Sequence, residues 1–492
     1  MKTTRLILFC FFIFSEAVAQ VDTLALQRLQ GQVDTLQNST FLQYGMLGVS
    51  VKVAKTGTPI LQYQSRKSLS PASTMKLLTT ATALTVLGEG FRYQTTLEHD
   101  GEIVNGVLKG NLYIRGTGDP TLGSGRFKGF LDMEELFARW VAKIKEIGIK
   151  EVQGSVIADA TIFEENAPPD TWNWNDMGNY YGAGAGGLNV NENSVKVIFK
   201  PSKIGEPASV VRTEPELLHV ELINHVKTDK AGTGDQVTIF SKPYDRELLL
   251  EGFVPYGVGE FAVRGAMPDP AYWLAYRFQE KLLESKITMC EEPTTIFQIQ
   301  RKYADYLSPK SSILDFVYSP SLSEIIKQCN FQSINLYAEA LLKTVGVKLG
   351  FQNTTSDGVK AQKQVWQSKG INLNGFLPKD GSGLSTVSGV TADNMTDILF
   401  KMANEPTFQA FYQSIPVLGQ TGTVRNLGKN TRAEGNVHAK SGSIEGVRCY
   451  AGYFTAKSGE LYCFSFMLNR YNAEAGNATK ALEKLMIMLC DL

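Results

Sequence analysis

The chain has 492 residues, in which 49 lysines and arginines balance 49 aspartates and glutamates, and 43% of the residues are hydrophobic. This composition suits a globular protein of about three domains. Without a basic block, nucleic acid and anionic membrane surfaces are not expected as partners, because both require a positive patch. The four histidines are scattered and no Cys-x-x-Cys occurs, so the spacing predicts neither a metal ion nor a cofactor.

The first residues have the pattern of a targeting signal. Two basic residues precede an apolar run over 6–14, and Ala17-Val18-Ala19 follows as a small-x-small cleavage site. The apolar run is too short for a bilayer, which needs about 20 residues, and no later run approaches that length. We interpret residues 1–19 as a signal peptide and expect an exported, periplasmic protein that does not span a membrane.

The elements before residue 92 alternate between helix and strand. Leucine and valine recur with helical spacing over 26–36. Residues 46–53 and 59–64 are typical of two strands around a turn. A second amphipathic helix is predicted to open at Ser73 and to end at Gly88.

The pattern changes over residues 93–297. Short strand-like runs are separated there by Gly, Asp and Pro, and they cover 95–97, 110–114, 152–157, 217–222, 236–240 and 246–252. We interpret residues 93–297 as a long β-rich insertion of two lobes.

Helical patterns return from about residue 312. They are predicted over 313–317, 325–328, 336–347, 361–368 and 392–404. Residues 447–456 and 461–468 alternate as an antiparallel hairpin, and a helix over 478–489 follows. We expect residues 20–92 and 298–492 to form the two parts of one α+β domain, an antiparallel sheet flanked by helices, with the Ser73 helix against the edge of the sheet.

The cysteines do not suggest a disulfide framework. One of the six lies in the signal, and the odd number that follows cannot pair completely. Cys449 and Cys463 flank the hairpin turn, but if Thr455 pairs with Leu461, then Cys449 faces Met467 and lies too far from Cys463 for a disulfide. We expect buried, inert thiols.

Ser73 and Lys76 form the only Ser-x-x-Lys of the chain. Residues three apart on a helix are neighbours, so the Lys76 amine can reach the Ser73 hydroxyl and act as its base. The N-terminus of the helix also favours negative charge beside the serine. The alternative is a helix cap followed by a solvated lysine, so the catalytic interpretation depends on other clusters.

Two further clusters carry similar chemistry. Ser333-Ile334-Asn335 is the only Ser-x-Asn and lies at a predicted loop–helix junction, where it could relay a proton and hold a carbonyl, or simply cap the helix. Lys-[Ser/Thr]-Gly occurs at 55–57, 440–442 and 457–459, and the first and last lie at hairpin tips, where glycine serves the turn. A strand carrying Lys440 and Ser441 could bind a carboxylate.

These three clusters, in this order, resemble the signatures of penicillin-binding proteins and serine β-lactamases. The separation of Ser73 from Ser333 is far larger than in a β-lactamase, and the chain looks like a class C low-molecular-weight penicillin-binding protein, of the D-alanyl-D-alanine carboxypeptidase/endopeptidase family. Further similar segments cover 116–122, 159–163, 172–174, 188–191 and 380–385. The resemblance spans essentially the whole mature chain.

The resemblance implies a serine-type D-Ala-D-Ala carboxypeptidase, with possible endopeptidase action, that cleaves peptidoglycan stem peptides and is acylated by β-lactams. Ser73 would be the nucleophile and Lys76 its base. Ser333 would pass the proton to the leaving D-alanine, and Asn335 would orient Lys76 and the substrate amide. The substrate-binding strand would comprise Lys440, Ser441, Gly442 and Ser443; Lys440 and Ser441 would hold the terminal carboxylate, and the N–H groups of Ser73 and Ser443 would form the oxyanion hole.

The chain departs from the family pattern at two positions. Ser441 stands where threonine is common, which keeps the hydroxyl, and Thr386 stands where the family often has arginine, so substrate preference can differ. Asp159 occupies a position that would contact the amino group of the peptide's diamino acid, or it is a turn aspartate. Trp172 and Trp174 are expected to pack at a lobe boundary.

Two alternative functions remain open from the sequence. The protein could be a serine β-lactamase, although no deacylating glutamate can be placed, or a non-catalytic cell-wall-binding or β-lactam-sensing protein. The balance between carboxypeptidase and endopeptidase action and the oligomeric state are likewise open.

Overall fold

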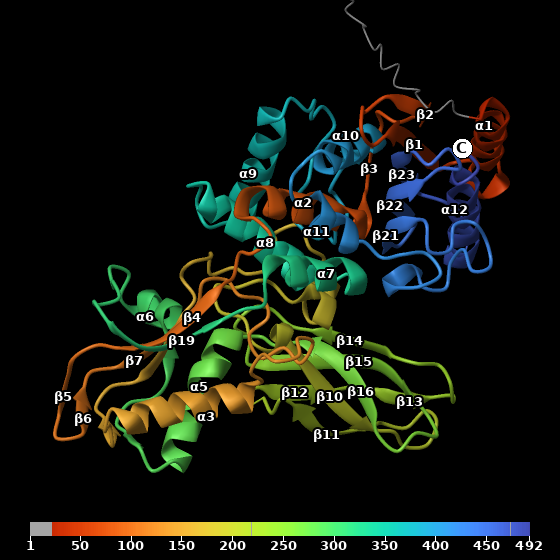
Figure 1. Ribbon diagram of the computed structural model, residues 1–492. Helices are drawn as coiled ribbons and strands as arrows, with labels where there is room; N and C mark the ends of the chain where they lie inside the picture. Colours follow the sequence, from red (N-terminus) through yellow and green to blue (C-terminus); the bar gives the residue numbers. More distant parts are fainter. Residues whose placement is uncertain (1–21, 218, 473) are drawn as a thin grey trace, which may run out of the picture.

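The computed structural model describes residues 22–217, 219–472 and 474–492 (Figure 1). The expected signal peptide lies outside the described residues. Within them, no helix combines the length and the apolar character that crossing a bilayer requires.

Both ends of the chain contribute to one five-stranded antiparallel sheet, in the order β2-β1-β23-β22-β21. Its strands are β1 (Met46–Val53), β2 (Pro59–Tyr63), β21 (His438–Ile444), β22 (Val447–Thr455) and β23 (Leu461–Asn469). β1 pairs with β23 from Met46 opposite Asn469 to Val53 opposite Tyr462. The two terminal parts of the chain therefore form one sheet, and the predicted strands and hairpin are confirmed.

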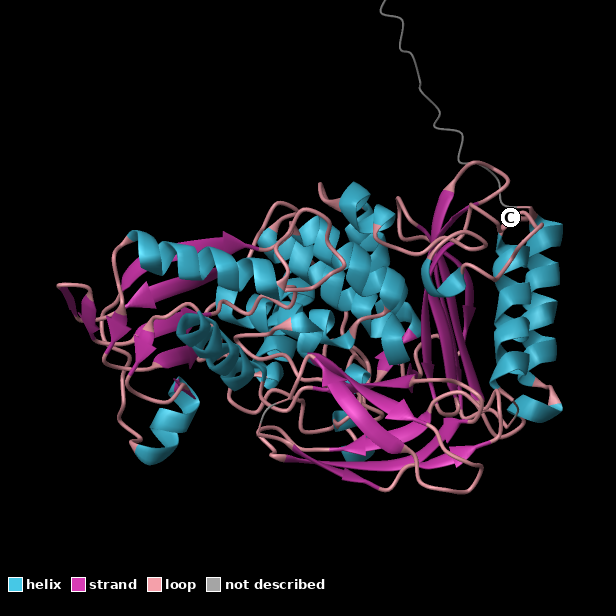
Figure 2. Ribbon diagram, turned by 90° about the horizontal axis from the view of Figure 1, so that it is seen from below, coloured by secondary structure: helices cyan, strands magenta, loops and turns pink. Residues whose placement is uncertain are grey.

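Helices cover both faces of this sheet. On one face α1 (Thr23–Gln37) and α12 (Ala475–Leu489) lie side by side and share an apolar core with the strands. A larger helical group covers the other face, and Figure 2 shows the sheet between the two layers. Because both faces are covered, β22 and β23 are buried on both sides, and their side chains do not alternate between core and solvent.

The helical group is built around α2 (Met75–Leu87). Around it lie α7 (Leu322–Gln332), α8 (Asn335–Lys348), α9 (Thr355–Ser368), α10 (Ala392–Ala403) and α11 (Phe408–Gln413). The prediction that α2 is amphipathic is wrong: every residue from Met75 to Leu84 is buried, because α2 contacts other helices on all sides. α8 is likewise buried from Asn335 to Gly346.

The hairpin has the expected register. Thr455 faces Leu461 and Cys449 faces Met467, so no disulfide joins Cys449 to Cys463. All five described cysteines are free thiols. Four of them are buried as expected, but Cys290 is exposed, because it follows a two-residue strand at the surface of the insertion.

The first lobe of the insertion is a mixed α/β unit. Its sheets have the orders β18-β9-β7-β4-β19 and β17-β8-β6-β5. Their strands are β4 (Gln94–His99), β5 (Glu102–Val104), β6 (Val107–Lys109), β7 (Leu112–Arg115), β8 (Glu151–Val152), β9 (Val156–Asp159), β17 (Thr288–Met289), β18 (Thr294–Thr295) and β19 (Ser312–Tyr318). Three helices accompany them, α3 (Met133–Glu146), α5 (Pro270–Glu284) and α6 (Ile296–Lys302).

The sequence interpretation missed the long helices of this lobe. α3 begins with a capping box in which Asp132 and Glu135 exchange hydrogen bonds, and its apolar residues from Met133 to Ile144 recur with helical spacing. The predicted strand over 152–157 is in fact two strands, β8 and β9, separated at Gly154.

The predicted helix over 313–317 is also wrong, because these residues lie in β19. β19 pairs antiparallel with β4, placing Phe316 opposite Thr96. A five-residue apolar run fits a strand as well as a helix, and only the long-range pairing decides between them. The end expected for the insertion at residue 297 is therefore too early, because the chain returns to the first lobe's sheet up to Tyr318.

The second lobe consists of two small sheets around their own apolar core. One has the order β11-β10-β16, and the other contains β12, β15 and β13, with β14 paired to β15. The strands are β10 (Ser194–Lys200), β11 (Ser209–Glu214), β12 (Glu221–Asn224), β13 (Lys227–Asp229), β14 (Gln236–Phe240), β15 (Glu247–Pro255) and β16 (Phe261–Ala266). The prediction over 236–240 is confirmed, whereas the strand expected over 217–222 begins only at Glu221.

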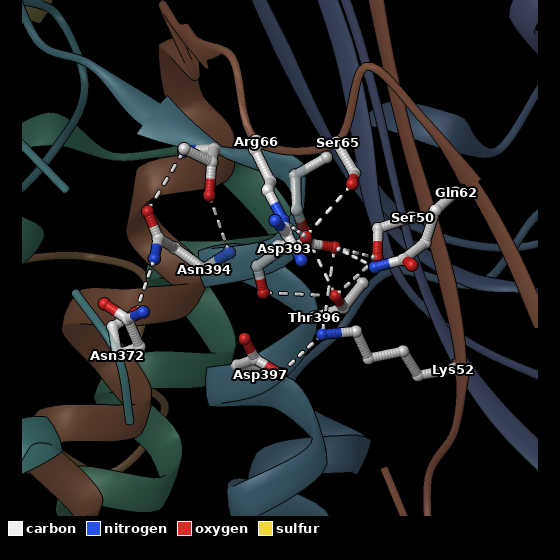
Figure 3. A network of polar contacts seen from close by, with 12 residues as sticks. Ser50, Lys52, Gln62, Ser65, Arg66, Asn372, Asp393, Asn394, Thr396 and Asp397 are labelled. Atoms are coloured by element: carbon white, nitrogen blue, oxygen red, sulfur yellow. Dashed lines mark hydrogen bonds and ion pairs between the residues drawn. The ribbon is translucent and has the colours of Figure 1, made fainter. Parts of the chain in front are cut away.

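A polar network joins the N-terminus of α10 to the first two strands of the central sheet (Figure 3). The Asp393 carboxylate accepts hydrogen bonds from Ser50 Oγ at 2.9 Å, Gln62 Nε2 at 2.9 Å and Ser65 Oγ at 3.0 Å. The Lys52 amine lies 3.8 Å from Asp393 and donates to Asp397 at 2.5 Å. A carboxylate in the first turn of a helix is also favoured by the helix dipole.

We expect Asp393→Ala to destabilise the protein by about 2–3 kcal/mol, because three donors lose their acceptor. The measurement is the Tm from thermal unfolding followed by circular dichroism. Asp393→Asn is the matched control and should lose less, because its amide oxygen can still accept from Ser50 and Gln62. An unchanged Tm for Asp393→Ala would contradict the stabilising role.

Candidate active site

Ser73 lies in a short 3-10 turn, Ala72–Thr74, directly before α2. The preceding residue, Ala72, is held at φ 44°, a left-handed conformation that costs a non-glycine residue about 1–2 kcal/mol. The turn is closed by Thr74 Oγ1, which donates to Pro71 O at 2.7 Å. Ser73 is thus held at the helix N-terminus by a strained turn, two residues before α2 begins at Met75, whereas the sequence predicted a helix that opens at Ser73.

The Lys76 amine is fully buried beside this serine. It donates to Ser73 Oγ at 2.9 Å, to Asn335 Oδ1 at 2.6 Å and to Ser382 O at 2.9 Å. These three acceptors come from the serine turn, from α8 and from the loop over 380–385. The expected reach of Lys76 to Ser73 is therefore present.

The lysine amines of the site have perturbed proton affinities. Burial lowers the pKa of Lys76 to about 8, against the opposing effect of the carboxylates of Asp380 and Glu339. Burial and the nearby charge of Lys76 hold the pKa of Lys440 well below its usual range. A neutral amine, the form that can accept a proton, is therefore accessible near neutral pH.

The second cluster lies between two helices. Ser333 ends α7 with φ 58°, and Asn335 is the first residue of α8, so the predicted loop–helix junction is confirmed. Asn335 bridges two regions: its Oδ1 accepts from Lys76 and its Nδ2 donates to Tyr181 O at 2.7 Å. Tyr181 belongs to the insertion, which therefore contributes directly to the site.

The third cluster lies on β21, the edge strand of the central sheet. Lys440 Nζ is buried and donates to Ser333 Oγ at 2.9 Å and to Ser441 O at 2.8 Å. Its amine therefore points at Ser333, whereas the resemblance implied a direct contact with a substrate carboxylate. Ser441 is half-buried, and its hydroxyl lies 2.7 Å from the exposed Thr423 hydroxyl, so two hydroxyls lie together at this edge.

Gly442 brings β21 into contact with the serine turn. A Cβ at this position would lie 2.7 Å from Pro71 O and 3.0 Å from Ser73 N. The strand can approach Ser73 this closely only because residue 442 has no side chain. Ser443, the next residue, is exposed and pairs with Arg448 of β22.

The loop over 380–385 is held by two buried carboxylates. Asp380 accepts from Trp172 Nε1 at 2.9 Å, from Gly383 N at 2.9 Å and from Ser385 N at 2.7 Å. Glu339 accepts from the backbone on the other side of the loop. β3 (Ser68–Leu69) and β20 (Val390–Thr391) pair antiparallel, which ties the chain after this loop to the chain before Ser73.

Sequence reasoning missed a polar stripe on α8. Asn335, Glu339 and Lys343 are four residues apart and buried in an otherwise apolar helix. Lys343 Nζ donates to Ala167 O and Ala185 O of the insertion, both at 3.1 Å, and pairs with Glu164 at 3.1 Å. The signal was present, because polar residues at i, i+4 and i+8 of an apolar helix mark one face.

The expected contact residue Asp159 is 2% exposed. Its carboxylate forms an ion pair with Arg115 and accepts from Thr161 N at 3.0 Å and Thr161 Oγ1 at 2.6 Å. An incoming ammonium group would have to displace these partners, so the contacts match the turn interpretation, and a role in reading the diamino acid stays a prediction. Another insertion carboxylate, that of Asp176, accepts from the hydroxyl of Tyr181 at 3.2 Å.

The two tryptophans behave differently. Trp172 is buried and bonds to Asp380, as packing at a boundary predicts. Trp174 is 61% exposed, with its ring 4.9 Å from that of Phe240, so the expectation of burial is wrong for it. The other Lys-[Ser/Thr]-Gly segments, 55–57 and 457–459, lie in the β1–β2 and β22–β23 turns, as predicted.

The fold is that of a penicillin-binding protein. The structure is similar to the crystal structure of penicillin-binding protein 4 (DacB) from Haemophilus influenzae, with a TM-score of 0.77 and 23% identity over 94% of this chain and 97% of that one. A second structure of that protein, in complex with a β-lactam, has a TM-score of 0.72 at 21% identity, again over 94% and 97% of the two chains.

Residues 29–488 match the model of the D-Ala-D-Ala carboxypeptidase 3 (S13) family, and the chain belongs to this family of serine peptidases. Its relatives include a D-alanyl-D-alanine carboxypeptidase from Actinomadura sp. (strain R39), 28% identical over 94% of this chain and 84% of that protein. The D-alanyl-D-alanine carboxypeptidase DacB of Haemophilus influenzae is 24% identical over 84% of this chain and 83% of that protein. The resemblance found from the three clusters is confirmed.

We expect Gly442→Ala to slow acylation of Ser73 by about 100-fold, because the added methyl group must push β21 away from the serine turn. The measurement is the rate of labelling by a fluorescent penicillin. Gly90→Ala is the matched control, since a Cβ at position 90 would meet no atom within 4 Å, and it should label at the wild-type rate. Wild-type labelling of Gly442→Ala would show that the close approach is not needed.

Proposed function

We propose that this protein is an exported serine peptidase that hydrolyses D-alanyl-D-alanine bonds of peptidoglycan stem peptides through an ester on Ser73. The observation that carries the proposal is the pair of buried lysine amines, each 2.9 Å from a serine hydroxyl: Lys76 from Ser73, and Lys440 from Ser333. Membership of the family supports the reaction class. The N-terminal pattern supports export to the periplasm.

In the acylation step, the neutral Lys76 amine takes the proton of the Ser73 hydroxyl while Ser73 Oγ attacks the carbonyl carbon of the penultimate D-alanine. The negative charge that develops on the carbonyl oxygen is stabilised by the backbone N–H groups of Ser73 and Ser443. Asn335 holds the lysine amine and, through its amide, orients the substrate.

The C–N bond then breaks, and the leaving D-alanine needs a proton on its nitrogen. The Ser333 hydroxyl, which accepts a hydrogen bond from the Lys440 amine, supplies this proton. Ser333 then recovers the proton that Lys76 took from Ser73, so the Lys76 amine is neutral again. The hydroxyls of Ser441 and Thr423 lie where the terminal carboxylate of the peptide is held. Water then attacks the ester carbonyl and gives a proton to the neutral Lys76 amine. Lys76 passes this proton to Ser73 Oγ as the ester C–O bond breaks, which frees the Ser73 hydroxyl and the shortened peptide.

The contacts of Glu339 disfavour a β-lactamase. A β-lactamase needs a base that activates the deacylating water, and the buried glutamate closest to the cluster, Glu339, is occupied by backbone N–H groups of the 380–385 loop. A non-catalytic sensor is disfavoured because all three clusters are present and hydrogen-bonded to one another.

Incubation with penicillin should add one covalent adduct to the wild-type protein, detected by intact-protein mass spectrometry, and Ser73→Ala should add none. Ser458→Ala, in the turn segment that repeats the Lys-Ser-Gly pattern, is the matched control and should be acylated like wild type. An adduct on Ser73→Ala at the wild-type level, or none on wild type, would refute the proposal. An adduct that disappears within seconds would favour the β-lactamase.

The acylation rate should rise about tenfold per pH unit below pH 8 and level off above it, because only the neutral Lys76 amine accepts a proton and its pKa is about 8. The measurement is the second-order rate of labelling by a fluorescent penicillin as a function of pH. A rate that falls as the pH rises through this range would exclude Lys76 as the base.

A further inference from the structure

Glu339 is fully buried on α8 and has no place in the reaction steps described above. Its Oε2 accepts from Gly381 N at 2.9 Å, and its Oε1 accepts from Ser382 N at 2.8 Å and from Gly381 N at 3.1 Å. The carboxylate therefore holds two successive backbone N–H groups of the loop that faces Lys76.

Two consecutive peptide units of this loop are each held at both ends. In the first, Glu339 accepts from the N–H of Ser382, and Thr79 Oγ1 donates to the carbonyl of Gly381 at 2.7 Å. In the second, Asp380 Oδ1 accepts from the N–H of Gly383 at 2.9 Å, and the carbonyl of Ser382 accepts from Lys76 Nζ at 2.9 Å. The direction of the Ser382 carbonyl, and with it that of the lysine amine, is thus set by the groups that hold these two units.

The charged and titratable groups that face Glu339 come from four elements. They are Asp380 in the loop, Lys76 on α2, Cys329 on α7 and Lys343 on α8 itself. Burial, with the charge of Asp380, raises the pKa of Glu339 to about 7, while the bonds to Ser382 and Gly381 oppose this effect. Glu339 favours the ammonium forms of both Lys76 and Lys343, but Lys343 is already paired with Glu164.

We propose that Glu339 is a positioning residue of the reaction: it fixes the Gly381–Ser382 backbone so that the Ser382 carbonyl aims the Lys76 amine at Ser73, and its charge sets how readily that amine gives up its proton. This inference rests on the proposed role of Lys76 as the base. It assigns two separable effects to one side chain, one of position and one of charge.

The two effects respond differently to substitution. Glu339→Gln keeps the length of the side chain and one acceptor oxygen but removes the charge, so Lys76 loses its proton more readily. Glu339→Asp keeps the charge but draws the carboxylate back by one methylene group, so the loop and the Ser382 carbonyl shift. A residue that served only stability would move neither the pH profile nor the rate in a folded variant.

The test measures the rate of labelling by a fluorescent penicillin across the pH range for both variants, with the Tm as a check of folding. For Glu339→Gln we expect the rise of the labelling rate with pH to occur about one pH unit lower than in wild type. The plateau rate reached at high pH should stay within about tenfold of wild type. For Glu339→Asp we expect the labelling rate to rise over the same pH range as in wild type, but to a plateau rate about 100-fold lower. Glu146→Gln, at an exposed site on α3, is the matched control and should leave both unchanged.

The inference would be overturned by a folded Glu339→Gln variant whose labelling rate rises over the wild-type pH range. A folded Glu339→Asp variant with the wild-type plateau rate would overturn it as well. If neither variant folds, Thr79→Val tests the same loop, because it removes the hydrogen bond to the Gly381 carbonyl without changing the side-chain shape. It should lower the plateau about tenfold, and a wild-type rate would overturn the inference. Failure of the wild-type protein to label at all would instead refute the proposed function.

Discussion

The site depends on one buried amine. Lys76 has no exposed surface, and burying an ammonium group is costly unless it is hydrogen-bonded or gives up its charge. Here both conditions are met in part: three oxygens accept from the amine, and burial brings its pKa down to about 8. The same burial that makes a charged lysine costly allows the Lys76 amine to lose its proton near neutral pH.

The three acceptors must converge within hydrogen-bond distance of a single nitrogen, and each comes from a different part of the chain. The surrounding architecture can be understood from this constraint. α2 is buried on all sides by the helices that pack around it, and one of these, α8, carries the acceptor Asn335. The loop over 380–385 is held by buried carboxylates on both sides, so that one of its carbonyls can face the amine. A loop without these contacts would leave the amine free to turn away from Ser73.

The insertion is part of this arrangement and not a separate attachment. Three of its contacts reach the candidate site. The Tyr181 carbonyl accepts from Asn335, and Trp172 donates to Asp380. The carbonyls of Ala167 and Ala185 accept from Lys343. Asn335 and Lys343 lie on one face of α8, together with Glu339. A single helix, α8, therefore contacts Lys76, the loop over 380–385 and the insertion.

From sequence alone, the three clusters, the antiparallel hairpin with its register, and the terminal helices could be predicted, because each rests on local spacing or on the chemistry of a few adjacent residues. The strand β19 and the polar stripe of α8 could not be assigned, because their identity depends on partners far away in the chain: β4 for the strand, and loops near residues 167, 181 and 381 for the stripe. That the Lys440 amine faces Ser333 was likewise decided by tertiary packing, since it requires an edge strand to meet the end of α7, and spacing along a sequence carries no information on where two distant elements meet.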